Sequence, residues 1–149
     1  MSFSQKSVYA LRAVYVLARR EGEGQISISC IAEEQKIPPR FLENILIQLK
    51  QAGIVKSVRG KEGGYLLARP AKTISVGDIL RATEGAIDAV SCLSGKHQDT
   101  CPMNNDCIFL SMWNKAQTAM FSVFDTTFFS DLVEEGRRRE MANAATYSI

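Results

Sequence analysis

Two consecutive prolines, Pro38 and Pro39, constrain how the first half of this chain can fold. Proline lacks a backbone donor and is tolerated in a helix only within its first turn, so the pair ends one segment and starts another. Apolar residues recur at spacings of three and four on both sides of the pair. The pattern predicts three helices, over 4–20, 27–35 and 39–52, with a tight turn before the third.

A charged, glycine-rich segment, RGKEGG at 59–64, follows the third predicted helix. Short apolar runs flank it, over 54–58 and 65–67, which is typical of two strands joined by a flexible hairpin tip. Ser75 and Asp78 have the spacing of a capping box and predict a helix that extends to about Glu84. Helix, helix, turn, helix and hairpin is the order of a winged helix-turn-helix.

The second half of the chain is organised differently. A long amphipathic helix is predicted from about Ile108, is interrupted at 126–127, and continues as a short helix through Val133. We therefore expect a mainly α fold with a small β-hairpin, a winged helix-turn-helix plus a long C-terminal dimerisation helix. The expected units are a DNA-binding domain at 1–70, a linking helix and cysteine-rich loop at 71–107, dimerisation helices at 108–136, and a poorly ordered tail at 137–149.

Charge is uneven along the chain, although the net charge is only +2. Residues 1–70 carry 11 Lys/Arg and 6 Asp/Glu, a difference of +5, whereas residues 71–149 carry 7 and 10, a difference of −3. The first half is therefore the candidate surface for a polyanion. A basic face that only contacts solvent would give the same count.

The helix after the proline pair is the candidate recognition helix, because the major groove admits one helix whose first turns meet the base edges. The hairpin tip offers cations between glycines, which suits phosphate or the minor groove. The alternative to DNA binding is that the same fold serves as a protein-interaction module. The residues expected to contact DNA are Lys6, Tyr9, Arg40, Phe41, Glu43, Asn44, Arg59, Gly60, Lys61, Gly64 and Tyr65.

Three cysteines, Cys92, Cys101 and Cys107, cluster in a polar, loop-like segment. No signal peptide or membrane-spanning run is apparent, so we expect a cytoplasmic protein, where clustered thiols more often bind metal or react than form structural disulfides. The gaps of eight and five residues suit an iron–sulfur cluster better than zinc, whose sites usually show short Cys pairs. A thiol switch remains open, as does a fourth ligand; His97 is more simply an exposed loop residue.

The helix from Ile108 carries more large apolar side chains than one narrow stripe requires, which predicts a partner surface. We expect a symmetric homodimer, because helix-turn-helix proteins commonly bind palindromic sites. Packing on its own winged helix is the alternative. The expected interface residues are Trp113, Ala116, Met120 and Phe124. No catalytic constellation is visible, so an enzyme is not expected.

The sequence resembles the Rrf-type (IscR/NsrR-like) winged-helix regulators over about residues 1–135. The similarity rests on SFSQKSVYALRAVYVLA, IPPRFLENILIQLKQAGIVKSVRGKEGGYLLARP, ISVGDILRATEG and the three cysteines before a long helix. It implies a homodimeric DNA-binding transcription factor, in which the residues matching Arg40, Glu43 and Arg59 contact DNA. It also implies a [2Fe-2S] or [4Fe-4S] cluster on the residues matching Cys92, Cys101 and Cys107.

The chain departs from that pattern at the fourth ligand. Leu110 stands where the IscR type has a histidine, Val8 stands where some NsrR-type members have an acidic ligand, and the first cysteine gap is longer than theirs. We therefore expect a DNA-binding regulator, a repressor, that senses iron, redox state or nitric oxide through a cluster of undetermined type. The alternative is a cluster-free thiol or protein-interaction switch that acts through a partner enzyme.

Overall fold

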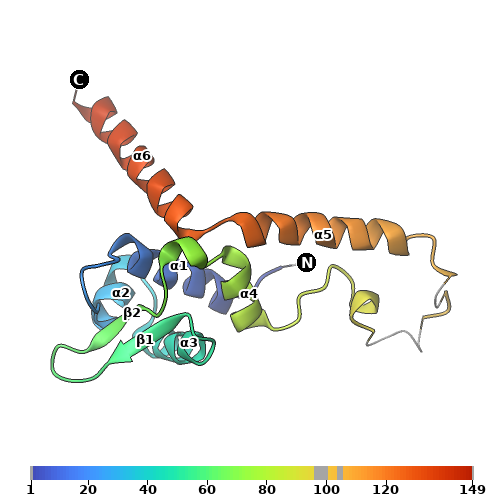
Figure 1. Cartoon of the computed structure of the whole chain (residues 1–149), viewed down its shortest axis with the longest axis horizontal. Helices are drawn as coiled ribbons and strands as arrows, with labels where there is room; N and C mark the ends of the chain where they lie inside the picture. The colour runs from blue at the N-terminus through green and yellow to red at the C-terminus, as the bar shows by residue number, and fades with distance from the viewer. Residues whose placement is uncertain (1, 96–100, 104–105, 149) are drawn as a thin grey trace.

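The structure is a computed structural model and describes residues 2–95, 101–103 and 106–148. Figure 1 shows a body that contains the hairpin and the first four helices, with two long C-terminal helices reaching away from it. The expected mainly α fold with a small hairpin is confirmed. In chain order the elements are α1 (Gln5–Arg19), α2 (Ile28–Gln35), α3 (Pro39–Gln51), β1 (Val55–Val58), β2 (Gly64–Leu67), the 3-10 turn η1 (Ala71–Thr73), α4 (Val76–Glu84), the 3-10 turn η2 (Ser91–Ser94), α5 (Leu110–Thr126) and α6 (Phe129–Tyr147).

Short polar side chains cap the first turns of three of the helices. Ser4 and Ser27 accept hydrogen bonds from backbone amides in the first turns of α1 and α2. Ser75 and Asp78 form the predicted capping box at the start of α4. Helix α3 has no side-chain cap and instead begins with Pro39 at its first position.

The hairpin is antiparallel, with Val55 opposite Leu67 and Val58 opposite Gly64. A further backbone bridge joins Tyr65 to Ile26, in the segment just before α2. A β-carbon at position 64 would collide with the carbonyl of Ile26, so only glycine lets the two backbones approach this closely. The wing is therefore tied directly to the helix-turn-helix.

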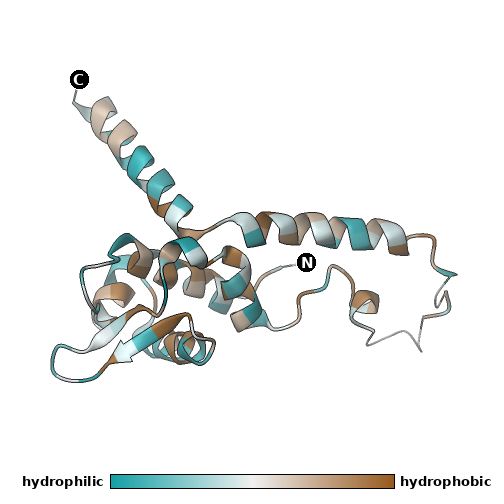
Figure 2. Cartoon of the chain, in the orientation of Figure 1, coloured by the Kyte–Doolittle hydropathy of each residue, from teal (hydrophilic) through white to brown (hydrophobic). Residues whose placement is uncertain are grey.

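One hydrophobic core holds α1, α2, α3, the hairpin, α4 and the start of α6 together. Phe129 and Val133 of α6 are buried in it, whereas none of the 17 residues of α5 is buried. Figure 2 shows brown, apolar segments along α5 even though that helix lies outside the body. The long helix thus offers surface that the core does not use.

The C-terminal region corrects one expectation. We expected a short helix through Val133 and a poorly ordered tail at 137–149, but α6 runs unbroken from Phe129 to Tyr147. Its exposed residues are mostly good helix formers, Arg, Glu, Met and Ala, and the ion pairs Glu134–Arg138 and Glu135–Arg139, four residues apart, add a small contribution. Smaller differences are that α5 begins at Leu110, and that Cys92 lies in η2 rather than in a structureless loop.

Candidate nucleic-acid interface

Helix α3 separates its residues as a recognition helix requires. Four side chains on one face, Leu42, Ile45, Leu46 and Leu49, are at most 1% exposed. The opposite face presents the four predicted contact residues, all exposed to solvent: Arg40, Phe41, Glu43 and Asn44. Burial of the first set fixes how the second set points, because a helix cannot rotate without exposing its apolar stripe.

Two predicted residues of α1 and α3 meet through their rings. Tyr9 and Phe41 pack edge to face with ring centroids 5.6 Å apart, and the Arg12 guanidinium lies 5.6 Å from the centre of the Tyr9 ring. Such contacts favour a fixed geometry for side chains that are only partly buried. Lys6 lies one turn earlier on α1 and is half-buried. The first turns of α1 and α3 therefore form one continuous surface.

The wing tip carries its charges into solvent. Arg59 and Lys61 are exposed, and Gly60 between them adopts a positive φ of 121° that favours glycine. The amide of Gly63 donates to the carbonyl of Gly60 at 3.0 Å, which closes the tip. Gln25 donates to the Glu62 carbonyl at 2.8 Å, so the tip is braced from the segment before α2.

A hollow of about 470 Å³ brings the wing together with α3 and the start of α2. It is lined by five of the predicted residues, Arg59, Gly60, Lys61, Gly64 and Tyr65. Lys50 also lines it and donates to the Ser57 hydroxyl at 2.6 Å. We did not predict Lys50, although its position ten residues after Arg40 on the exposed face of α3 is a signal that could have found it.

The cysteine segment follows α4. Cys92, Cys101 and Cys107 are half-buried free thiols. Among the described residues, no group of three or more His, Cys, Asp or Glu side chains is arranged to hold a metal ion. His97, named above beside the open question of a fourth ligand, lies outside the described residues. Thiols are the ligands that iron–sulfur clusters take, so the donor chemistry fits such a cluster, but the described geometry does not gather three of them.

Cys30 is apart from this segment. It is half-buried, and an Arg20 guanidinium nitrogen lies 3.4 Å from its sulfur. Arg20 also pairs with Glu34 at 3.0 Å. Cys30 therefore belongs to the contacts between α1 and α2.

The predicted dimer residues lie on α5, outside the core. Trp113, Met120 and Phe124 are half-buried, and Ala116 is exposed. Phe124 packs edge to face against Phe3 with ring centroids 5.6 Å apart, so this end of α5 contacts the N-terminus of its own chain. Exposed Met112 and Val123, at 47% and 61%, extend the apolar surface further along the helix.

The end of α4 is bonded to the start of α1. Glu84 accepts from the Ser4 amide at 2.7 Å and from the Ser4 and Ser7 hydroxyls at 2.6 and 2.5 Å. These hydrogen bonds lower the pKa of Glu84, with those from the two serine hydroxyls contributing most. Ser7 also shares a 2.6 Å hydrogen bond with Thr83. The helix that bears Lys6 and Tyr9 is thus hydrogen-bonded to the end of α4, which directly precedes the cysteine segment.

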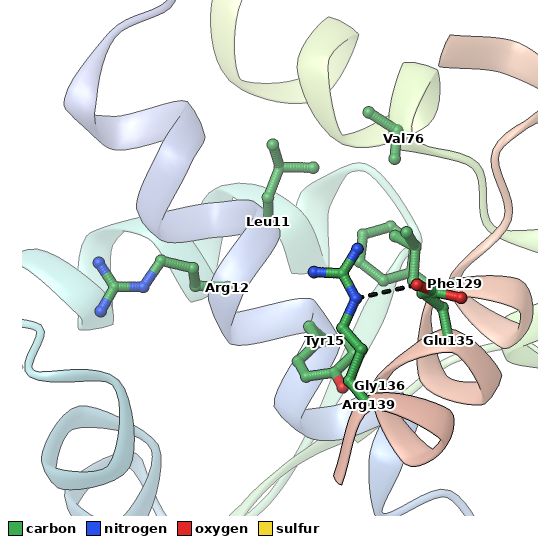
Figure 3. Close-up of a pocket in the computed structure, with 9 residues that line it drawn as sticks. Leu11, Arg12, Tyr15, Val76, Phe129, Glu135, Gly136 and Arg139 are labelled. Carbon is green, nitrogen blue, oxygen red and sulfur yellow. Dashed lines mark hydrogen bonds and ion pairs between the residues drawn. The ribbon is translucent and has the colours of Figure 1, made fainter. Parts of the chain in front are cut away.

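An apolar groove of about 410 Å³ lies between α1 and α6 (Figure 3). Leu11 and Tyr15 line it from α1, and Phe129 from α6. At its rim Arg139 donates to Glu135 at 2.9 Å. A β-carbon at position 136 would collide with the Tyr15 hydroxyl, so Gly136 sets how closely the two helices approach.

The fold is that of a winged helix-turn-helix, and the proteins that match this chain are DNA-binding transcriptional regulators, not enzymes. A family model, Rrf2, described as an iron-dependent transcriptional regulator, matches residues 3–135. The chain belongs to the Rrf2 family. Among the described residues, no helix is long and apolar enough to cross a membrane.

Relatives of two kinds are similar over nearly the whole chain. The regulator CymR of Bacillus subtilis is 35% identical over 89% of this chain and 89% of its own length. The regulator IscR of Yersinia pseudotuberculosis is 31% identical over 96% of this chain and 85% of its own. Among solved structures, B. subtilis CymR, titled a global cysteine regulator, has a TM-score of 0.78 at 31% identity, covering 91% and 98% of the two chains. T. potens IscR has a TM-score of 0.71 at 33% identity, covering 91% and 88%.

Proposed function

We propose that this regulator binds a palindromic operator in the cytoplasm as a homodimer and represses transcription there. The observation that carries the proposal is the exposed face of α3, with Arg40 at its first turn, beside the cationic wing tip at Arg59 and Lys61. A helix in the major groove and an arginine in the adjoining minor groove would then read one half-site together. The exposed apolar surface of α5 supports pairing of two copies.

We further propose that the cysteine segment is the sensor. Cys92, Cys101 and Cys107 would hold an iron–sulfur cluster, which when bound would supply a redox-sensitive and nitric oxide-reactive centre. The family description as iron-dependent and the IscR relatives support this assignment. The segment is joined to α5, because Gln117 accepts from the Ala89 amide at 2.8 Å and donates to Asp88 at 3.4 Å. A conformational change in the cysteine segment would therefore alter the position of α5, the helix proposed to pair the two copies.

A cluster-free thiol switch is the second candidate. The similarity to CymR favours it, and among the described residues no three His, Cys, Asp or Glu side chains are grouped to hold a metal ion. In this form two of the cysteines would be oxidised by a peroxide or disulfide oxidant, forming one sulfur–sulfur bond with loss of two protons and two electrons to that oxidant. The same hydrogen bonds, which Gln117 of α5 accepts from the Ala89 amide and donates to Asp88, would transmit the change.

The DNA interface is tested at the wing. Replacing Arg59 with Ala should cost about 1–3 kcal/mol in operator binding and relax discrimination at the bases it contacts. Replacing Lys61 with Ala should weaken binding to all sequences alike and reduce the slope of log K against log salt by about 0.9. Fluorescence anisotropy at several salt concentrations measures both. Unchanged operator affinity in both variants contradicts the assignment of the wing.

The sensor is tested on protein purified without oxygen. Iron and sulfide analysis with a visible spectrum should show both elements at stoichiometric amounts, and the Cys92→Ser, Cys101→Ser and Cys107→Ser variants should each lose them. Cys30→Ser is the matched control and should keep them. A colourless wild-type protein whose operator affinity changes reversibly with oxidant and dithiothreitol favours the thiol switch instead.

A further inference from the structure

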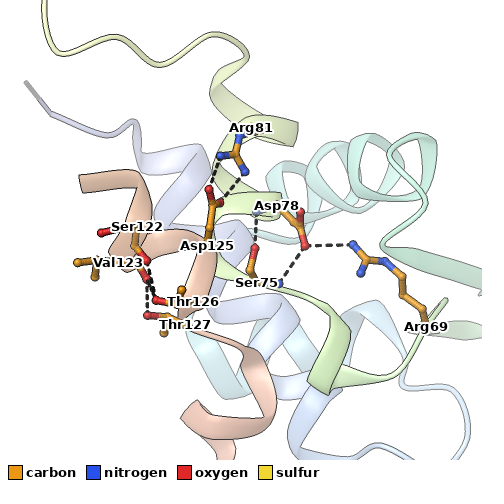
Figure 4. Close-up of polar contacts among 9 residues, drawn as sticks. All are labelled: Arg69, Ser75, Asp78, Arg81, Ser122, Val123, Asp125, Thr126 and Thr127. Atoms are coloured by element: carbon orange, nitrogen blue, oxygen red, sulfur yellow. Dashed lines mark hydrogen bonds and ion pairs between the residues drawn. The ribbon is translucent and has the colours of Figure 1, made fainter. Parts of the chain in front are cut away.

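Four charged residues link the base of the wing to α5 across α4 (Figure 4). Arg69, two residues after β2, donates to Asp78 at 3.1 Å. One turn further along α4, Arg81 donates to the two carboxylate oxygens of Asp125 of α5 through its two terminal nitrogens, at 2.7 and 2.8 Å. Asp125 lies 44 residues from Arg81 in the chain, so this ion pair joins the DNA-reading unit to the long helix.

The Arg81–Asp125 pair is fixed in orientation as well as in distance. The guanidinium lies 4.8 Å from the centre of the Phe121 ring, one turn earlier on α5. The hydrogen bonds to Arg81 lower the pKa of Asp125, so both partners stay charged through the physiological range. A bidentate arginine–carboxylate contact defines an angle, which a single hydrogen bond does not.

Backbone hydrogen bonds also join the start of α4 to the end of α5, and we call this contact region, together with the Arg81–Asp125 pair, the α4–α5 joint. The Val76 amide donates to the Thr127 carbonyl at 2.9 Å, and the Phe129 amide donates to the Ile74 carbonyl at 3.0 Å. These bonds fix the corner between α5 and α6 against the start of α4. They act as a pivot at one end of α5, and the Arg81–Asp125 pair then sets the direction in which the rest of the helix leaves.

Gly77 makes room for this contact. A β-carbon at position 77 would collide with the Asp125 carboxylate, the far end of a side chain that could move only by leaving Arg81. Position 77 has no positive φ, so alanine would suit the helix and add helical propensity. The glycine is therefore explained by the ion pair and not by the backbone.

Stability alone does not account for the pair. Its side chains are 46% and 42% exposed, and ion pairs at such sites contribute little to folding free energy. What the pair does determine is the direction of α5 relative to α3. If two copies join through α5, that direction sets the distance and the rotation between the two recognition helices.

We propose that the Arg81–Asp125 contact, with the space left by Gly77, determines which half-site spacing the dimer accepts. The inference rests on the proposed function, since it requires a homodimer on a two-part operator. Each added base pair moves one half-site by about 3.4 Å and rotates it by about 35°. A dimer with a fixed joint should therefore bind one spacing well and its neighbours poorly.

The test uses the full chain and an operator selected by the wild-type protein from random duplex DNA. Central insertions and deletions of one and two base pairs give a spacing series, and anisotropy gives the affinity ratio between the best spacing and its neighbours. Gly77→Ala and Asp125→Asn should each lower that ratio about fivefold or more. Both variants should bind an isolated half-site as the wild type does.

Charge reversal separates the contact from general damage. Arg81→Asp should lower the spacing ratio, and Arg81→Asp combined with Asp125→Arg should restore much of it. Glu135→Gln, which removes an exposed ion pair within α6, is the control and should leave the ratio unchanged. A wild-type protein that is monomeric, or that selects no two-part operator, refutes the proposed function. If Gly77→Ala, Asp125→Asn and Arg81→Asp all keep the wild-type spacing preference, this inference is refuted and the proposed function is not.

Discussion

Glu84 joins the end of α4 to the start of α1. It accepts hydrogen bonds from Ser4 and Ser7 and precedes the cysteine segment. Hydrogen bonds from Ser4 and Ser7 hold the pKa of its carboxyl below the usual 4.5. A carboxyl whose pKa is lower in the folded protein stabilises the fold above the unfolded pKa and ceases to do so as the pH falls through the folded one.

Glu84→Gln keeps the shape and an oxygen acceptor but removes the charge. We expect it to lower the free energy of unfolding by about 1 kcal/mol at pH 7, the difference between charged and neutral hydrogen bonds. The deficit should shrink as the pH is taken well below 4.5, where the wild-type carboxyl is protonated too. Urea unfolding at several pH values measures this. Glu23→Gln, in an exposed loop, is the control, and an equal deficit at all pH values contradicts the account.

At the scale of elements, the packing of α6 on α1 depends on Gly136. Alanine there should gain about 1 kcal/mol of helix propensity but meet the Tyr15 hydroxyl, and overpacking of this kind costs about 1–3 kcal/mol. We expect Gly136→Ala to be neutral or destabilising in the wild type and stabilising when Tyr15→Phe has removed the hydroxyl. A double-mutant cycle by thermal unfolding gives the coupling, and a coupling near zero would show that the helices do not touch here.

The sequence predicts the elements whose ends are set by local signals better than those that lack an apolar pattern. Caps and prolines are local, so Pro39 and the Ser75–Asp78 box located two helix starts correctly. The second half of α6 was not predicted, because apolar periodicity indicates a buried helix face and residues 137–148 are exposed. Its helix formers and ion pairs four residues apart were the signal to use.

The candidate site was predictable to a similar degree. The exposed face of α3 follows from its buried stripe, so Arg40 and Asn44 could be placed from spacing alone. The Arg81–Asp125 pair could not, because two residues 44 apart carry no local sign that they meet. The clustering of three cysteines in sequence likewise did not specify their arrangement in space, which a loop between two helices leaves undetermined.

At the scale of the whole molecule, the prediction concerns pairing through α5. Ala116 is exposed, so a glutamate there should leave the isolated chain folded but place a charge in the proposed interface. We expect Ala116→Glu to shift the protein from dimer to monomer in sedimentation equilibrium, with an unchanged circular dichroism spectrum. Thr118→Glu is the matched control, since it is also exposed but points to another side of α5. A dimer that survives Ala116→Glu argues against this surface.

The close approach of Gly64 to Ile26 has a consequence for the duplex. Because the wing strand is hydrogen-bonded to the segment before α2, the exposed face of α3 and the wing tip, which are proposed to contact DNA, cannot adjust independently. On the proposed operator the DNA would supply the adjustment, at a cost that depends on the stiffness of the base steps between the two contacts. Sequence positions that no side chain touches would then contribute to selectivity through the work of deforming them.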